Sequence, residues 1–250
     1  METIRVAISA NLKHSDGRSI IAEDMLARLD QAPGLRYEFL TERLRQITPG
    51  QIRGAHILIQ SGLVVNQATF AEGAENLTFV CLYSLGYDTV DLPACTAAGV
   101  AVTRTRGISR HTVASGALLL MLALSKRLMD KQRIVYQGDW TSRADLFGHD
   151  IQHKVLGIVG LGDIGRELVR IVQPFEMTIL ASDPYVDDEV FRDLGMERAD
   201  LDDLLARSDL VSLHCALTDE TRGLIGRREL RLMKPTAYLV NTARGPVVDQ

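Results

Sequence analysis

The fold is decided by Lys154-Val155-Leu156-Gly157-Ile158-Val159-Gly160-Leu161-Gly162-Asp163-Ile164-Gly165. Its first part, Val155–Val159, is an uninterrupted apolar run, as expected of a parallel strand buried on both faces. Glycines then follow at the spacing GxGxxG, and apolar residues recur at helical intervals as far as Val172. The stretch therefore predicts a strand, a tight glycine turn and a helix in immediate succession.

The glycine turn has the features of a dinucleotide site. Gly160 permits the tight turn, Gly162 lets the backbone approach a pyrophosphate, and Gly165 lets the helix pack closely on the strand. The helix N-terminus offers unpaired N–H groups to that anion. Asp183 comes about 20 residues later, just past a second expected strand, where a carboxylate accepts hydrogen bonds from the ribose hydroxyls of NAD and repels the 2′-phosphate of NADP. The sequence therefore predicts NAD as the cofactor.

Short apolar runs alternate with helix-period segments along the whole chain, which indicates parallel α/β sheets. The first series of expected strands is Arg5–Ser9, Arg36–Leu40, His56–Gln60, Thr78–Cys81 and Val100–Thr103. The second is Val155–Val159, Thr178–Ala181, Asp209–Leu213 and Ala237–Asn241, preceded by a long apolar helix at Thr112–Leu128. We predict two doubly wound parallel-sheet domains, a flavodoxin-like substrate domain over residues 1–103 and an NAD-binding Rossmann domain over residues 104–250.

Composition excludes several classes of function. The 250 residues are 46% hydrophobic and 24% charged, and this length and composition are sufficient for two domains, each with its own hydrophobic core. A net charge of −4 offers no basic face for nucleic acid and no polybasic membrane anchor. The three cysteines form no close pair and the N-terminus lacks a signal-peptide pattern, so a cytoplasmic protein is expected. His149 and His153 stand four apart without a third ligand, and no metal site is expected.

Four segments, taken in order, point to one family. They are Ser84–Asp91, Val155–Asp183, Val211–Ile225 and Met233–Gly245. Together they resemble the NAD-dependent D-2-hydroxyacid dehydrogenases, the group that includes phosphoglycerate dehydrogenase and the glyoxylate and hydroxypyruvate reductases. The resemblance implies hydride transfer between NAD(H) and a small 2-oxo or 2-hydroxy acid, with the cofactor supplying the difficult chemistry. It also implies a homodimer, to which the helix Thr112–Leu128 contributes.

The resemblance assigns roles to individual residues. Arg244 would bind the carboxylate of the substrate and polarise the substrate's carbonyl group, because a guanidinium is planar, permanently charged and presents parallel N–H donors. Backbone N–H groups around Ser84, Leu85 and Gly86 would hold the other side of that carboxylate. The residues implied to contact the cofactor are Gly160, Gly162, Asp163, Ile164, Gly165, Asp183, Pro184, His214, Cys215, Thr242, Ala243 and Arg244.

Three of these assignments have plainer alternatives. Residues 84–86 taken alone could be an ordinary turn at a strand end, and His214 could be a satisfied structural histidine. Arg244 could form a surface ion pair. Its place directly after a buried strand, at the edge where parallel sheets bind ligands, favours the functional interpretation.

In the family, the general acid/base is a histidine paired with a glutamate, and both follow the arginine motif, beyond Gln250 of this sequence. Neither role is assigned to a residue present. Without a positioned proton donor we expect catalysis to fall by about 10²–10⁴-fold, and the Rossmann domain to lack its usual last strands. Three explanations stay open: a truncated form of an ordinary enzyme, a partner chain that completes the sheet, or a shortened NAD-binding protein. The alternative function is a non-catalytic, NAD(H)-sensing interaction protein of the co-repressor type.

Overall fold

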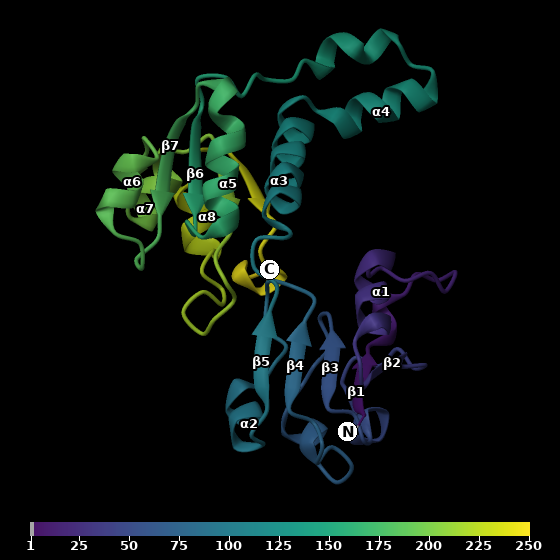
Figure 1. Cartoon of the computed structure of the whole chain (residues 1–250). Coiled ribbons are helices and arrows are strands. Elements are labelled where there is room, and N and C mark those ends of the chain that lie inside the picture. The colour runs from purple at the N-terminus through teal and green to yellow at the C-terminus, as the bar shows by residue number, and fades with distance from the viewer. Residues whose placement is uncertain (1–2) are drawn as a thin grey trace. The chain divides into compact units, whose positions relative to one another are not determined.

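In the computed structural model, which describes residues 3–250, the chain forms two units, each built on a five-stranded parallel sheet (Figure 1). Unit 1 ends at Ile108, and unit 2 spans Ser109–Gln250. The predicted α/β class with two parallel sheets is confirmed.

Unit 1 has the strand order β2-β1-β3-β4-β5, which is the flavodoxin-like order. Its elements are β1 (Ile4–Ile8), α1 (Glu23–Gln31), β2 (Leu35–Phe39), β3 (Ile57–Gln60), β4 (Phe79–Leu82), α2 (Leu92–Ala97) and β5 (Ala101–Arg104). Short 3₁₀ helices lie at Ala10–Leu12, Pro49–Ile52 and Gln67–Phe70. Successive side chains of β1 enter different cores: Val6 and Ile8 pack near α1, whereas Ala7 packs with Leu58 on the opposite face.

Unit 2 has the strand order β10-β9-β6-β7-β8. Its strands are β6 (Val155–Val159), β7 (Thr178–Ser182), β8 (Glu197–Arg198), β9 (Leu210–Leu213) and β10 (Tyr238–Asn241). Its helices are α3 (Arg110–Ser125), α4 (Leu128–Gln137), α5 (Asp163–Val172), α6 (Asp188–Asp193), α7 (Leu201–Arg207) and α8 (Arg227–Leu232), with 3₁₀ turns at Thr141–Leu146, Gln173–Phe175 and Gly245–Val247. When the five strands are numbered 1 to 5 in chain order and the sheet is read from β8 to β10, the order is 3-2-1-4-5, which is that of a dinucleotide-binding sheet.

Both faces of the second sheet are covered, which is why β6 reads as a continuous apolar run. Leu156 and Ile158 of β6 pack in one core cluster with residues of α3 and α5. Val159 packs in another with Leu204 and Leu205 of α7. Because all strands run parallel, the loops after β6, β7, β9 and β10 meet at the carboxyl edge of the sheet, where ligands of such folds bind.

The helix predicted at Thr112–Leu128 is wrong at its C-terminal end. The structure divides this region into α3 and α4 at Arg127, whose φ of 53° is left-handed. The side chain of Arg127 stabilises this bend, because its Nε donates to Asp130 Oδ2 at 3.0 Å and its Nη1 to the carbonyl oxygen of Asp145 at 3.0 Å. No single described helix is long and apolar enough to cross a membrane, although α3 and α4 have the length and composition as a pair bent by 60°.

Candidate functional site

The turn after β6 is shaped by contacts that only glycine permits. Gly160 has a φ of 92°, and a Cβ at this position would lie 2.5 Å from the backbone nitrogen of Cys215. At Gly165, in the first turn of α5, a Cβ would lie 2.4 Å from the carbonyl oxygen of Gly160. The loop after β9, the glycine turn and α5 are therefore packed backbone against backbone.

Gly162 differs from these two glycines, because a Cβ there would meet nothing within 4 Å. It is the N-cap residue of α5 and makes no side-chain cap hydrogen bond. The first N–H groups of α5 thus have no side-chain acceptor at the cap, and the backbone in front of them is bare. This arrangement fits the pyrophosphate of a dinucleotide, which needs close approach to amide donors.

Asp183 joins the end of β7 to the glycine turn. Its Oδ2 accepts a hydrogen bond from the Leu161 N–H at 2.8 Å, and its Oδ1 accepts one from the Tyr185 N–H at 3.0 Å. Each carboxylate oxygen has a second lone-pair direction, so the same group can also accept from two hydroxyls. The position and fixed orientation of Asp183 fit a ribose diol bound beside the pyrophosphate.

His214 lies on the loop after β9 with both ring nitrogens engaged. Nε2 lies 2.9 Å from Ser212 Oγ, and Nδ1 lies 3.4 Å from Thr242 Oγ1 on the loop after β10. Burial lowers the pKa of His214 to about 4, so the imidazole is neutral near pH 7. Burial also raises the pKa of the neighbouring Cys215 thiol, which stays protonated. The observed role of the His214 side chain is to connect two loops at the sheet edge.

The loop after β10 carries Arg244 and is shaped by Asn241. The Asn241 Nδ2 donates to the carbonyl oxygen of Arg244 at 2.8 Å, and its Oδ1 accepts from the Ala243 N–H at 3.0 Å. Arg244 itself is exposed and donates from Nη1 to the carbonyl oxygen of Ala243 at 2.9 Å. Sequence reasoning missed Asn241, although an asparagine at a strand end is a recognised signal for such a side-chain-stabilised turn.

Ser84, Leu85 and Gly86 belong to unit 1, and two side chains orient their peptide groups. Ser84 Oγ donates to the carbonyl oxygen of Gly86 at 3.0 Å. Arg104, at the end of β5, donates from Nη1 to the carbonyl oxygen of Leu85 at 3.4 Å. Since C=O and N–H point in opposite directions across a trans peptide, the N–H of Gly86 points away from Arg104.

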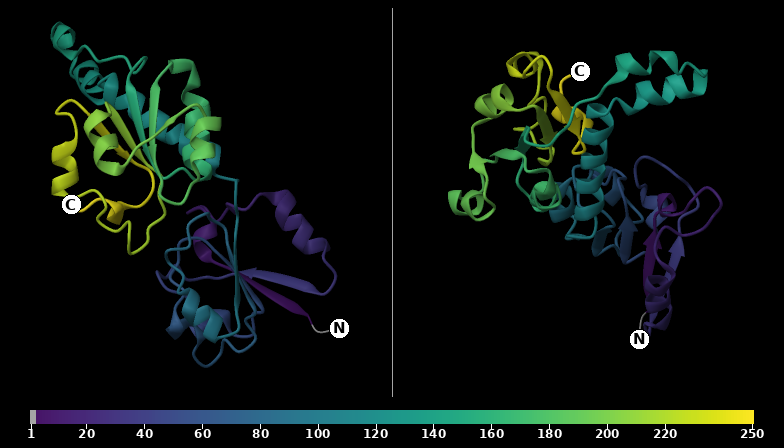
Figure 2. Two further views of the ribbon diagram at one scale, coloured as in Figure 1. Left: turned by 90° about the vertical axis from the view of Figure 1, so that its left-hand side faces the viewer. Right: turned by 90° about the horizontal axis from the view of Figure 1, so that it is seen from above.

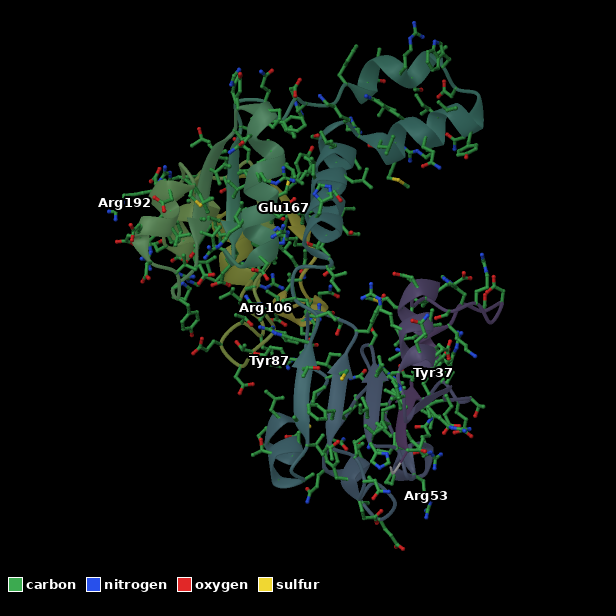
Figure 3. The ribbon with its side chains drawn as sticks, viewed as in Figure 1. Tyr37, Arg53, Tyr87, Arg106, Glu167 and Arg192 are labelled. Atoms are coloured by element: carbon green, nitrogen blue, oxygen red, sulfur yellow. The ribbon has the colours of Figure 1, made fainter. Side chains whose placement is uncertain are left out.

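The guanidinium of Arg104 is also held by an aromatic ring. Its central carbon lies 5.2 Å from the ring centroid of Tyr87, which Figure 3 labels. Sequence reasoning assigned no role to Arg104 or Tyr87, because nothing in their local pattern indicates which carbonyl oxygen the arginine reaches. All other predicted site residues belong to unit 2.

Within unit 2, the structure brings the predicted residues to one edge. They occupy the turn after β6 (Gly160, Gly162, Asp163, Ile164, Gly165), the end of β7 (Asp183, Pro184), the loop after β9 (His214, Cys215) and the loop after β10 (Thr242, Ala243, Arg244). Among residues 3–250, no three histidine, cysteine, aspartate or glutamate side chains are grouped to hold a metal ion.

Comparison with known proteins agrees with this geometry. Residues 118–250 match the family model described as "D-isomer specific 2-hydroxyacid dehydrogenase, NAD binding domain". The chain belongs to this family. The predicted family is therefore confirmed, and the match supports NAD as the cofactor of unit 2.

Individual family members show how far the similarity extends. Glyoxylate reductase of Korarchaeum cryptofilum (strain OPF8) is 41% identical over 182 residues, which cover 72% of this chain and 55% of that protein. D-3-phosphoglycerate dehydrogenase of Methanocaldococcus jannaschii is 32% identical over 238 residues, which cover 95% of this chain and 43% of that protein. The chain thus spans about half the length of the curated relatives that it matches.

Solved structures resemble the chain over almost its whole length. A protein of Thermus thermophilus superposes with a TM-score of 0.84 at 30% identity, covering 98% of this chain and 76% of that one. D-lactate dehydrogenase of Aquifex aeolicus, solved in complex with NAD and lactic acid, gives a TM-score of 0.82 at 26% identity, covering 98% and 70%. Neither the family model nor these relatives support the alternative of a co-repressor-type sensor.

Proposed function

We propose that the protein is an NAD-dependent D-2-hydroxyacid dehydrogenase, which transfers hydride reversibly between NAD(H) and a small 2-oxo or 2-hydroxy acid. One observation carries this proposal: the bare backbone at Gly162 in front of α5 lies beside the oriented carboxylate of Asp183. A family match over residues 118–250 supports it. In this proposal residues 1–103 form the substrate domain and residues 104–250 the cofactor domain.

On the cofactor side, the amides at the start of α5 bind the pyrophosphate and Asp183 accepts the ribose hydroxyls. Pro184, His214, Cys215, Thr242 and Ala243 line the remaining cofactor surface together with Asp163 and Ile164. Bound NAD(H) supplies or accepts the hydride. The protein's part is to orient the dinucleotide and to exclude NADP(H) through the negative charge of Asp183.

On the substrate side, we assign the carboxylate of the 2-oxo acid to Arg244 and to the N–H groups around Ser84, Leu85 and Gly86. Arg244 keeps its charge at any working pH and can pair with a carboxylate through two parallel hydrogen bonds. The same guanidinium stabilises the negative charge that develops on the carbonyl oxygen when hydride reaches the carbon. Asn241 positions Arg244 through the loop backbone.

The carbonyl oxygen also needs a proton, and His214 is a poor source of one. Its ring is partly buried, both nitrogens have protein partners, and its lowered pKa keeps it neutral near pH 7. Arg244 can supply only the electrostatic part of the stabilisation. The family's acid/base histidine and the glutamate paired with it follow the arginine motif, so the proposed activity is that of the whole protein.

The test of this function is NADH consumption by the whole protein with glyoxylate, hydroxypyruvate and pyruvate, followed by absorbance. We expect turnover with at least one of them, and a loss of about 10²–10³-fold for Arg244→Gln, the size of effect seen when one stabilising donor is removed. Arg222→Gln, which removes an exposed arginine between β9 and β10, is the matched control. If NADH binds but no 2-oxo acid is reduced, the enzyme assignment fails and a sensing role replaces it.

We also propose that the protein is a homodimer formed through α3 and the α4 arm, defined as residues 126–150. The arm projects from the rest of unit 2 in each view of Figures 1 and 2. Its large apolar side chains are exposed: Met129 by 71%, Tyr136 by 82%, Phe147 by 80%. Leu119, Leu120 and Leu124 on α3 are also exposed. Several large exposed apolar side chains on neighbouring helices favour a protein–protein interface.

Light scattering after size exclusion tests the dimer. We expect twice the monomer mass for the wild type and a monomer for Tyr136→Glu combined with Phe147→Asp, since charges would be buried without partners. A wild-type monomer at micromolar concentration contradicts the proposal. We place the protein in the cytoplasm, a location supported by the free thiols of Cys81, Cys95 and Cys215.

A further inference from the structure

A side-chain bridge links the two loops that flank the glycine turn. Tyr185, three residues after the end of β7, donates its hydroxyl hydrogen bond to Glu220 Oε2, on the loop after β9. In the sheet, β6 lies between β7 and β9. The bridge therefore connects the loops on either side of the turn after β6, and neither of its residues was assigned a role from the sequence.

The bridge is coupled to Asp183. The Tyr185 N–H donates to Asp183 Oδ1 at 3.0 Å, so the backbone that carries the phenol is fixed by the ribose-binding carboxylate. The hydrogen bond and charge of Glu220 raise the pKa of the Tyr185 phenol, and the charge of Asp183 adds to this effect. The phenol keeps its proton and remains a donor to Glu220.

The result is that a second carboxylate, Glu220 on the loop after β9, is linked through Tyr185 to Asp183, and the charges of both reach the Tyr185 phenol. The described residues provide neither Asp183 nor Glu220 with an ion-pair partner, so their charges are not neutralised by a neighbouring arginine or lysine. A 2′-phosphate carries nearly two negative charges and would have to enter this region. A 2′-hydroxyl carries none.

We propose that Glu220, held in place by the Tyr185 hydroxyl, is a second acidic determinant of the preference for NAD(H) over NADP(H). This inference rests on the proposed binding of the dinucleotide at Asp183 and deepens it. Tyr185 is a positioning residue in this account. Glu220 is a specificity residue that acts by repulsion, because discrimination between ligands is often achieved by disfavouring the wrong one.

The test is to measure dissociation constants of NADH and NADPH by fluorescence titration of the 250-residue chain and its variants. For Glu220→Gln we expect NADPH to bind about fivefold more tightly, which is the range of one exposed charge–charge interaction. NADH should change by less than about twofold, because its ribose carries no charge at the 2′ position. The gain for NADPH should shrink at high salt, since screening weakens interactions between exposed charges.

Two further variants separate charge at this position from other effects. Tyr185→Phe keeps the ring and both carboxylates but releases Glu220, and we expect a smaller shift in the same direction. Asp219→Asn removes one negative charge from the same loop without touching the bridge, and the NADPH-to-NADH ratio should stay at the wild-type value. A merely structural role of the bridge would weaken both nucleotides equally and would not depend on salt.

The inference is overturned if Glu220→Gln leaves the NADPH-to-NADH ratio unchanged, or if Asp219→Asn shifts it by the same factor. In either case NADH still binds, and the proposed function stands. Should the wild-type chain bind neither nucleotide, the proposed function fails together with this inference.

Discussion

The carboxyl edges of the two sheets are built from different kinds of contact. In unit 2, Gly160 and Gly165 bring three backbone segments so close that no side chain fits between them. In unit 1, the comparable loop is shaped by side chains, with Ser84 and Arg104 donating to carbonyl oxygens. Backbone contacts of this kind admit only glycine and are therefore visible in a sequence, whereas a hydrogen bond from a distant side chain leaves no local pattern.

The largest effect is expected where the backbone contact is closest. In Gly160→Ala, the new methyl group would lie 2.5 Å from the Cys215 nitrogen, and the residue would keep a φ of 92° that disfavours a side chain. We expect a loss of about 3 kcal/mol in the free energy of unfolding, measured by urea denaturation with circular dichroism.

Gly195→Ala is the matched control in the same unit. Gly195 has a φ of 66° but an open Cβ direction, so only the backbone term of about 1 kcal/mol should be lost. Equal costs for the two variants would mean that the contact with Cys215 contributes nothing, and the contrast between the two sheet edges would lose its basis.

The next largest effect is expected on nucleotide binding, in a variant of Asp183. Asp183→Asn keeps the shape of the side chain but removes its charge, and charge-assisted hydrogen bonds contribute roughly 1.5–3 kcal/mol each. We expect NADH to bind about 10- to 100-fold more weakly, with a smaller loss for NADPH because the repulsion of its 2′-phosphate is relieved. Fluorescence titration measures both. Unchanged discrimination between the two nucleotides would contradict the role of Asp183.

The stability of unit 2 should fall at acid pH, because α5 and α3 are joined by an ion pair. Glu167 of α5 accepts from Arg170 at 2.6 Å and pairs with His111 of α3 at 2.8 Å; Figure 3 labels Glu167. These contacts lower the pKa of Glu167 from 4.5 to about 2. Because the native state holds the proton less tightly, the stabilisation is complete above pH 4.5 and is lost as the pH falls toward 2.

Thermal unfolding across this pH range, for the wild type and Glu167→Gln, measures that contribution. The variant should have a lower midpoint than the wild type at pH 7, and the two curves should converge toward pH 2. Parallel curves at all pH values would show that the pairing between α3 and α5 carries no charge-dependent stability.

The smallest effect is expected in unit 1. Arg104→Met removes an exposed donor whose hydrogen bond to Leu85 is 3.4 Å long, so the loop should loosen without unfolding. We expect binding of oxamate, an unreactive 2-oxo acid analogue, to weaken about fivefold in the presence of NADH. NADH affinity itself should not change. Arg36→Met removes the same charge from β2 and should leave the affinities for oxamate and NADH unaltered. If this control weakens oxamate binding as much as Arg104→Met does, a specific role for Arg104 is excluded.

The fold was most predictable where a strand is buried on both faces, as β6 and β9 are. Val155–Val159 was placed correctly to the residue, since its apolar run is bounded by a lysine and a glycine. The two-residue strand β8 and the helices α2 and α6 were not predicted, because elements this short contain too few residues to show a period. The division at Arg127 was missed because a left-handed arginine depends on its bonds to Asp130 and Asp145.

The part of the site that is formed by the glycine turn was predictable. The glycines and Asp183 follow a spacing that the geometry of a strand–turn–helix unit imposes. Tyr185 and Glu220 are 35 residues apart in the sequence and meet only because β7 and β9 flank β6. Such pairs follow from strand order, which a single sequence does not specify.

Titration of the 250-residue chain with NADH tests the central claim most directly, because that claim is the binding of a dinucleotide at the turn after β6. Isothermal calorimetry should give one saturable site per chain, competition by NAD, and weaker binding of NADPH. Folded protein that releases no heat with NADH or NAD would contradict the account, and the redox assignment would fall with it.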